Sequence, residues 1–169
     1  FKEISSMFYY YDYSRDDNHF ILITTSYDSL INIYNEKNPE EAEKLRSIRG
    51  GHTFLDKINE INCLAFSFQL NLFATGSTDG LVVIWDFEMS KIDDICYLPF
   101  GKAEKVHVYS LKFLDPYPVL VATYSDGTIY FWGVKPHSKY RGECIMRGRN
   151  FFKLGHKIEL SSIKVCEFV

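Results

Sequence analysis

The residues best suited to chemistry in this sequence are its histidines, its cysteines and a few hydroxyl and carboxylate side chains near them. His52, Thr75 and Asp79 are the types that form a hydrolase triad, in which a hydroxyl attacks, an imidazole takes its proton and a carboxylate orients the imidazole. We expect no such reaction, because Thr75 lies inside an expected strand, Asp79 lies in an expected hairpin turn and no Gly-x-Ser-x-Gly elbow occurs. The chain is therefore expected not to be an enzyme.

Metal and cofactor sites are not expected either. None of His52, His107, His137 and His156 has a second ligand at the short spacing that zinc sites use. The four cysteines form no Cys-x-x-Cys pair, so reduced and buried thiols are the expected state. The sequence also has no Walker loop, no dinucleotide fingerprint and no calcium-loop spacing. We expect no metal, no cofactor and no small-molecule substrate.

The composition is that of a globular chain rich in strands. The 169 residues are 46% hydrophobic and 17% aromatic, and aromatic rings pack well on a pleated, half-buried surface. A net charge of −3 does not indicate binding to nucleic acid or to an anionic membrane. The longest apolar runs, such as Leu81–Trp85, are far shorter than a membrane span. Neither nucleic acid nor a membrane is therefore expected as a partner.

One unit of sequence occurs three times. The segments that align without gaps are SYDSLINIYN at 26–35, STDGLVVIWD at 77–86 and YSDGTIYFWG at 124–133. Their aspartates, Asp28, Asp79 and Asp126, lie 51 and 47 residues apart. A period near 50 with several short strands is typical of propeller blades rather than of helical solenoids.

The middle repeat predicts four strands. In chain order they are Ile61–Phe68, Asn71–Gly76, Leu81–Asp86 and Asp94–Leu98. The turn Thr78-Asp79-Gly80 suits a hairpin because glycine accepts a positive φ. The run Leu81–Trp85 is apolar throughout, which is typical of a strand buried on both faces. Between the third and fourth strands the repeats differ: Asn38–Lys44 predicts a capped helical turn, whereas Phe87–Asp93 predicts an acidic loop.

On these residues the chain resembles the WD-repeat family of β-propellers. Gly51-His52 opens the middle repeat and Trp85-Asp86 closes its third strand, with the spacing of the family's pattern. The resemblance implies a buried chain of hydrogen bonds whose role is architectural, because a complete polar network rigidifies the unit that contains it. The set implied in the middle repeat is His52, Thr75, Asp79 and Trp85.

The repeats on either side carry incomplete versions of this set. The first repeat has Tyr34 where Trp is expected. The third has Ala122 at the Thr position and Gly101-Lys102 in place of Gly-His. The degenerate equivalents that the resemblance implies are Thr24, Asp28, Tyr34, Asp126 and Trp132.

The expected fold class is all-β. We expect a partial β-propeller of four-stranded antiparallel WD-repeat blades: about three blades plus the first strand of a fourth, in a segment of a longer chain. The blades are expected at residues 1–50, 51–100 and 101–150, and residues 151–169 are expected to start a further one. Gly155-His156 reopens the pattern there, with Ile163–Phe168 as the first strand.

Two surface features are candidates for binding a partner. The first is the basic stretch, Lys135–Lys153, which has six cationic residues and one acidic residue. It is either a solvated outer loop or a docking site for an acidic partner. Its candidate residues are Lys135, Lys139, Arg141, Arg147, Arg149 and Lys153. The second is the aromatic run Met7–Tyr13. Alternate residues of a strand face opposite ways, so half of the run is expected to pack in the core, and an interface role remains open for it.

The resemblance implies a stiff frame that holds several proteins at once. We expect a non-catalytic, protein-binding scaffold subunit of a large intracellular assembly. Irregular repeats and long loops resemble the WD-repeat proteins of cilia and flagella, which makes tubulin and axonemal proteins candidate partners and the cytoplasm, cytoskeleton and axoneme the expected locations. The alternative is a substrate-recognition or regulatory adaptor in ubiquitin ligation, chromatin or trafficking.

Overall fold

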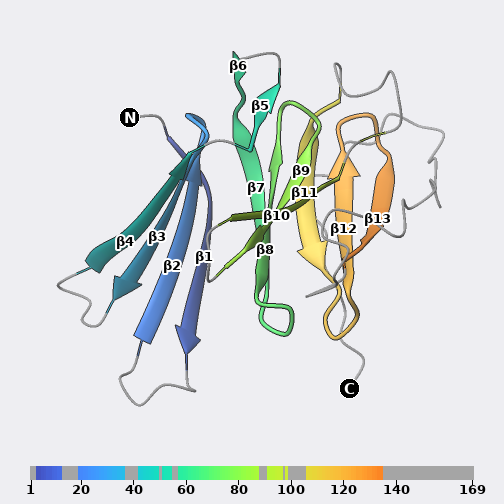
Figure 1. The fold of residues 1–169 in the computed structure, drawn as a ribbon. Helices are drawn as coiled ribbons and strands as arrows, with labels where there is room; N and C mark the ends of the chain where they lie inside the picture. Colours follow the sequence, from blue (N-terminus) through green and yellow to red (C-terminus); the bar gives the residue numbers. More distant parts are fainter. Residues whose placement is uncertain are drawn as a thin grey trace.

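The fold was analysed in a computed structural model, and every element that it describes is a β-strand (Figure 1). The described residues are 3–12, 19–36, 42–49, 51–54, 57–87, 91–96, 98 and 106–134. Among them there is no helix long and apolar enough to cross a membrane.

The strands form three upright antiparallel sheets that stand side by side (Figure 1). Sheet one contains β1 (Ile4–Asp12), β2 (His19–Ser26), β3 (Leu30–Glu36) and β4 (Ala42–Arg49). Sheet two contains β7 (Ile61–Ser67), β8 (Leu72–Ser77), β9 (Val82–Asp86) and β10 (Lys91–Cys96). Sheet three contains β11 (Val108–Phe113), β12 (Val119–Tyr124) and β13 (Ile129–Gly133). In each sheet, strands adjacent in sequence are adjacent in space, which confirms the all-β prediction of antiparallel, blade-like units.

The three sheets repeat the same strand register. Ile4, Ile61 and Val108 each pair with the last residue of the following strand, and a register shift occurs within the next two residues in all three cases. This shared register makes positions in the three sheets equivalent. Met7, Leu64 and Leu111, for example, share a position, as do the residues Thr24, Thr75 and Ala122 opposite them.

The Asp-Gly turns form as the sequence predicts. Gly80 and Gly127 have φ angles of 75° and 78°, in the left-handed region that glycine enters without a Cβ penalty. Sheet one has Ser29 at the same position, with φ 61°. The Ser29 hydroxyl donates a hydrogen bond to the carbonyl of Asn59, which belongs to the chain leading into sheet two. The residue with the left-handed backbone, Ser29, thus also makes a hydrogen bond to the segment that leads into the neighbouring sheet.

Each of these turns is also tied to the start of its own sheet. The amide of Tyr27 donates to the Glu3 carbonyl at 3.2 Å, and the amide of Thr78 donates to the Glu60 carbonyl at 2.9 Å. In sheet three the amide of Ser125 donates to the His107 carbonyl at 2.9 Å. His107 Nδ1 in turn donates to the Thr78 carbonyl at 2.6 Å, which links the turns of sheets two and three.

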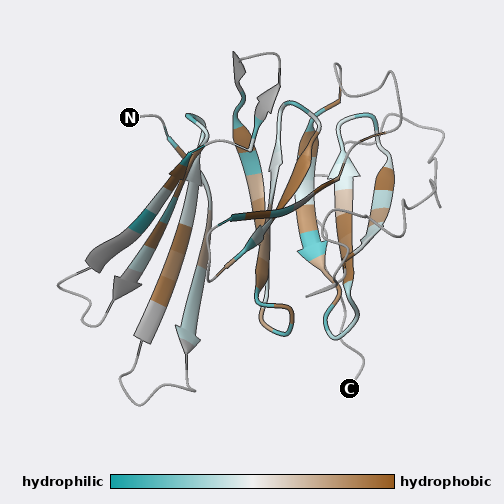
Figure 2. Cartoon of the chain, in the orientation of Figure 1, coloured by the Kyte–Doolittle hydropathy of each residue, from teal (hydrophilic) through white to brown (hydrophobic). Residues whose placement is uncertain are grey.

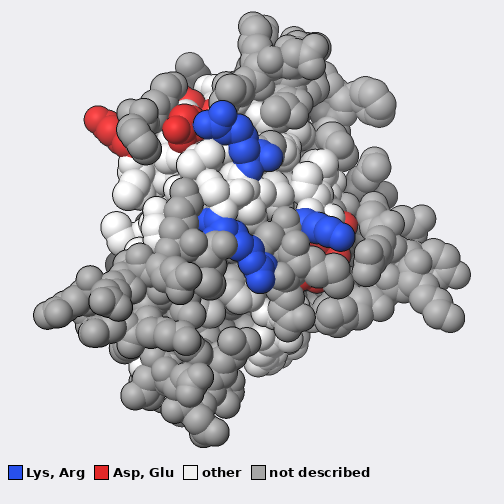
Figure 3. Space-filling view, turned by 60° about the vertical axis from the view of Figure 1, so that its left-hand side comes forward, with Lys and Arg blue, Asp and Glu red and all other residues white. Residues whose placement is uncertain are grey.

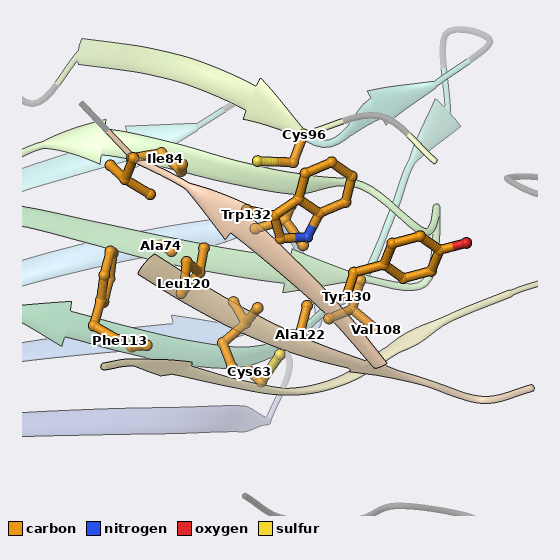
Figure 4. Packing of buried hydrophobic residues seen from close by; sticks show 14 of the residues in the cluster. Cys63, Ala74, Ile84, Cys96, Val108, Phe113, Leu120, Ala122, Tyr130 and Trp132 are labelled. Atoms are coloured by element: carbon orange, nitrogen blue, oxygen red, sulfur yellow. The ribbon is translucent and has the colours of Figure 1, made fainter. Parts of the chain in front are cut away.

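The core lies in the two interfaces between neighbouring sheets. Strand β9 serves both, because Val83 and Trp85 pack toward sheet one while Val82 and Ile84 pack toward sheet three. All four side chains are buried, which confirms the prediction of a strand covered on both faces. Apolar residues accordingly run through the central strands in Figure 2, and Figure 4 shows the packing between sheets two and three.

Two local expectations were wrong. Ala42–Lys44, expected in a helical turn, belong to β4, and Ala42 pairs with Glu36 across the sheet. Lys91–Asp93, expected in an acidic loop, belong to β10. In both places the hydrogen-bond ladder of a neighbouring strand outweighs a weak local preference. The sequence also gave no indication of the hairpin of β5 (Thr53–Phe54) and β6 (Lys57–Ile58).

The described sheets fall within the ranges 1–50, 51–100 and 101–150 that the repeats predict. The boundaries themselves stay a prediction. The expected further repeat at 151–169, with Gly155-His156 and Ile163–Phe168, lies outside the described residues, as does the expected Gly101-Lys102.

Candidate functional site

Four buried polar side chains form a continuous hydrogen-bonded chain in sheet two. Trp85 Nε1 lies 2.8 Å from Thr75 Oγ1, and Thr75 Oγ1 lies 2.8 Å from His52 Nε2. On the other side of the ring, His52 Nδ1 lies 3.3 Å from both carboxylate oxygens of Asp79. The structure therefore brings together the full set that the resemblance implies for the middle repeat.

Only one order of donors satisfies every group in this chain. The Trp85 N–H can only donate, so the Thr75 hydroxyl accepts from it. The single Thr75 proton then goes to His52 Nε2, and His52 donates its Nδ1–H to the Asp79 carboxylate. Asp79 Oδ1 also accepts from the amide of Leu81 at 2.9 Å, which fixes the turn.

The backbone around the site explains how the local sequence positions His52. Asn59 holds the chain near it, because both its amide and its side-chain Nδ2 donate to the His52 carbonyl, at 3.2 and 3.1 Å. Gly51 has a φ of 80°, and a Cβ built on it would lie 2.7 Å from the Trp85 ring. Only glycine combines that backbone conformation with that close approach.

The enclosure of this set decides what it can do. His52 and Thr75 are fully buried and Asp79 is nearly so. A nucleophile must reach a substrate, and the Thr75 hydroxyl already uses its proton and one lone pair within the protein. The order carboxylate, imidazole, hydroxyl is that of a triad, but here it joins β8, β9, the turn between them and the segment that contains His52.

Sheet three keeps the Trp but lacks the hydrogen bonds that hold it in sheet two. Ala122 occupies the position of Thr75, and the Trp132 indole N–H and the Tyr124 hydroxyl are buried without a hydrogen-bond partner. Burial raises the pKa of Tyr124 well above 10, although the nearby Trp132 N–H opposes part of the rise. Asp126 is exposed and accepts hydrogen bonds from the amide and the hydroxyl of Thr128. Figure 4 shows Trp132 and Ala122 from neighbouring strands of this sheet.

Sheet one keeps the carboxylate but pairs it differently. Asp28 accepts a hydrogen bond from the Ser26 hydroxyl, and this bond holds the pKa of the Asp28 carboxyl below its usual value. Thr24 is buried and Tyr34 is half-buried, on the face of the sheet turned away from sheet two. Sequence reasoning missed the Ser26–Asp28 pair and Tyr124, although Ser26, Ser77 and Tyr124 share one position of the repeat.

The other candidate chemical groups are scattered. Cys63 and Cys96 are buried thiols, as expected, and burial raises the pKa of Cys63 to about 12. The described residues contain no group of three or more His, Cys, Asp or Glu side chains able to hold a metal ion. On the face in Figure 3 described cations lie next to acids at the upper left and at the right, and no large patch of one charge is visible among the described residues. The basic stretch, His137 and His156 lie outside the described residues.

The aromatic run divides as strand alternation predicts. Phe8 and Tyr10 face sheet two, where Phe8 stacks on Phe66 at 5.1 Å and Tyr10 meets Phe68 at 4.1 Å between ring centroids. Met7 and Tyr9, between them in sequence, are exposed. Phe8 and Tyr10 therefore pack against sheet two, whereas Met7 and Tyr9 form part of an open surface.

Comparison with known proteins agrees with the repeats and the fold. The model of the family "WD domain, G-beta repeat" matches residues 43–86 and 99–133. The chain is 31% identical over 86 residues to WD repeat-containing protein 1 of Gallus gallus, which covers 51% of this chain and 14% of that protein. It is also 31% identical over 84 residues to a guanine nucleotide-binding protein subunit beta of Nicotiana tabacum. That alignment covers 50% of this chain and 22% of that protein. The match thus spans less than a quarter of either relative.

Solved structures give the same fold. The WD40 repeats of RRP9 superpose with a TM-score of 0.57 at 20% identity, over 79% of this chain and 36% of that chain. The computationally designed Ika4 protein superposes with a TM-score of 0.64 at 17% identity, over 98% of this chain and 81% of that chain. The repeats, the stacked antiparallel sheets and the buried Trp–Thr–His–Asp chain point the same way. The chain contains WD repeats, at residues 43–86 and 99–133, and its described strands have the fold of β-propeller blades.

Proposed function

We propose that this chain is a non-catalytic, protein-binding part of a multi-subunit assembly. The observation that carries the proposal is the contrast between its polar and its apolar groups. In sheet two the side chains of the triad-like set, His52, Thr75 and Asp79, are enclosed and bonded to each other, whereas several large apolar side chains of sheet one lie open. Enclosed polar networks stabilise a frame, and exposed apolar patches bind protein.

The open apolar side chains lie on the face of sheet one that is turned away from sheet two. Ile4, Met7 and Tyr9 are 60%, 68% and 52% exposed. The equivalents of Ile4 in sheets two and three, Ile61 and Val108, are completely buried against the preceding sheet. In sheets two and three the preceding sheet covers the equivalent face. The apolar face of sheet one therefore has the character of a surface that protein covers.

Charged variants of this face test whether it binds protein. Met7→Asp and Tyr9→Asp, introduced together, are expected to abolish co-purification of partners with the full chain, because burying a carboxylate in an apolar contact is costly. Tyr117→Asp is the matched control, since Tyr117 is 67% exposed on a turn of sheet three. Circular dichroism checks that all variants are folded. If the double variant retains the same partners in the same amounts, this face is not the binding surface.

At a finer level, we propose that the assembly is cytoskeletal, in a cilium or axoneme, with tubulin or axonemal proteins as partners and the cytoplasm or cytoskeleton as the location. Support comes from the basic stretch, whose charge complements acidic tails, and from the irregularity of the flanking repeats. Co-sedimentation of the full chain with microtubules tests it. Charge reversal at Arg147 and Arg149 is expected to abolish binding, and a chain that never co-sediments contradicts the proposal.

The second candidate is a regulatory or substrate-recognition adaptor. The likeness to a guanine nucleotide-binding protein subunit beta favours it, because that relative is by name a subunit of a guanine nucleotide-binding protein. Identifying the proteins that co-purify with the chain separates the two candidates: cytoskeletal subunits support the first, and ligase, chromatin or trafficking subunits support the second.

A further inference from the structure

The apolar face of sheet one corresponds, position by position, to faces that sheets two and three bury. Ile4 is 60% exposed, whereas its equivalents Ile61 and Val108 are completely buried. In both of those sheets the cover is the preceding antiparallel sheet, which stands beside it (Figure 1). The kind of surface that fits this face is therefore the face of another β-sheet.

The middle of this face carries a polar residue that the covered faces lack. Asn32 occupies the position of Val83 in sheet two and of Tyr130 in sheet three, and both of those are buried. The Asn32 side chain is half-buried and accepts a hydrogen bond from the Ser47 hydroxyl at 2.9 Å. A cover would take this amide out of water, so the cover must itself offer hydrogen-bonding groups.

The two edges of sheet one carry opposite charges at the end where its turn lies. Glu3 precedes β1 at one edge and Arg49 ends β4 at the other, and both are exposed. Ile48 packs toward sheet two, so strand alternation turns Arg49 to the apolar face. Glu3 occupies a position that can reach a cover, because its equivalent in sheet three, His107, donates to the Thr78 carbonyl of sheet two.

From these features we infer that the cover is a second copy of this chain, packed face to face on sheet one about a two-fold axis that runs along the strands. Such an axis places β1 of one copy over β4 of the other and keeps the two turn ends together. Glu3 of each copy then lies opposite Arg49 of the other. Asn32 lies close to the axis, where it meets an amide that can both donate and accept. The inference rests on the proposed function, because it names the partner of the face proposed there.

Paired charge reversals in the full chain test which residues meet, with sedimentation equilibrium as the measurement. Glu3→Arg alone and Arg49→Glu alone each place like charges opposite each other twice in the dimer, and each is expected to weaken dimerisation about tenfold. The two changes together restore both pairs and are expected to bring the affinity back. Lys112→Glu is the matched control, because Lys112 is exposed on β11 of sheet three and its reversal is expected to leave the dimer unchanged. Circular dichroism checks that all variants are folded.

A zero-length cross-link gives a second readout, which does not depend on affinity. In the Arg49→Lys variant a carbodiimide joins the introduced amine to the Glu3 carboxylate only where the two groups touch. Within one copy these residues lie at opposite edges of a four-stranded sheet, about 14 Å apart, so the cross-link is expected only between copies. Mass spectrometry of a mixture of isotopically light and heavy chains identifies it.

The outcomes separate this inference from the proposed function. A chain that is monomeric at every concentration overturns the inference, and so does a dimer that the single reversals leave unchanged or that the double reversal fails to restore. If a monomeric chain still loses its co-purifying proteins through Met7→Asp and Tyr9→Asp, the proposed function stands and a second copy is excluded as the cover. If a monomeric chain keeps those proteins in the double variant, both proposals fail.

Discussion

Sheets two and three place a tryptophan at the same position and support it in different ways. Each indole is buried and stacks on a neighbouring ring, Trp85 on Phe73 at 5.8 Å and Trp132 on Tyr130 at 5.6 Å. Only Trp85 has an acceptor for its N–H. The apolar half of the motif has therefore been kept where the polar half has been lost. Packing alone is sufficient to keep a blade in shape, and the hydrogen-bonded chain adds rigidity to that packing.

The two interfaces between neighbouring sheets also differ in the kind of contact that they make at one equivalent position. Tyr10 and Phe68 meet between sheets one and two, with ring centroids 4.1 Å apart. The equivalent positions between sheets two and three are Ser67 and Asp115, whose side chains share a hydrogen bond of 2.7 Å. One position thus joins neighbouring sheets by a tilted aromatic contact in one case and by a charge-assisted hydrogen bond in the other.

The largest effect is expected from breaking the hydrogen-bonded chain at its centre. Thr75→Val keeps the shape of the side chain but leaves the Trp85 N–H and His52 Nε2 without partners in a fully buried site. It is expected to lower the free energy of unfolding by about 3 kcal/mol, measured by denaturant titration. A loss below ~0.5 kcal/mol would show that the chain of hydrogen bonds contributes little to stability.

Removing each indole N–H in turn compares the two sheets directly. Trp85→Phe leaves Thr75 without its donor and is expected to cost about 1–3 kcal/mol through the lost hydrogen bond, beyond the change in packing. Trp132→Phe removes a group that has no protein partner, so its cost is expected to be smaller by about 1 kcal/mol. Thermal and denaturant unfolding of both variants measure the difference. Equal losses would contradict the comparison.

Single substitutions at the shared interface position test the second comparison. Ser67→Ala removes the hydrogen bond to Asp115 and also one to the Leu70 amide, and is expected to cost about 1–2 kcal/mol. Phe68 is 47% exposed, so Phe68→Ala is expected to cost about 1 kcal/mol or less. The Ser67 effect is expected to be retained in high salt, because its site is partly buried and therefore weakly screened.

The last expected effect is absent at neutral pH and develops only in alkali: a loss of stability that comes from the interface between sheets two and three. Burial raises the pKa of Cys63 to about 12 and that of Tyr124 well above 10. A raised pKa means that the folded state favours the protonated form. Its contribution is therefore complete below the unfolded pKa, near 9 for the thiol, and is lost as the pH rises towards 12. Cys63→Ser is expected to flatten part of this decline in denaturant titrations between pH 8 and 11.

The sequence predicts sheet two well because several independent patterns agree there. The Asp-Gly turn, the apolar strand and the positions of His52 and Trp85 all require the same four-stranded unit, and local and tertiary preferences coincide. The start of β4 shows the opposite situation. Asn38–Lys44 has good local helix chemistry, but pairing with β3 determines the outcome for Ala42–Lys44, and no property of that segment alone encodes its partner.

The polar groups of sheets one and three were harder to predict. Matching positions to the family pattern finds Asp28 and Trp132 but not their surroundings, because partners depend on side chains two residues away. Ser26 takes the carboxylate of Asp28, and Tyr124 brings a phenol beside Trp132. Comparing the residue types at the Ser77 position across the three repeats would have revealed both substitutions.

The tied turns of the three sheets have a mechanical consequence. Each turn is fastened to the start of its own sheet, and Ser29 and His107 fasten turns to the neighbouring units. A pull on the turn of sheet one or sheet two would be divided between the bond to its own sheet and the bond to the neighbouring unit, so that more than one hydrogen bond carries the tension. A partner bound along this edge would therefore transmit force to the neighbouring sheets as well as to the sheet that it contacts.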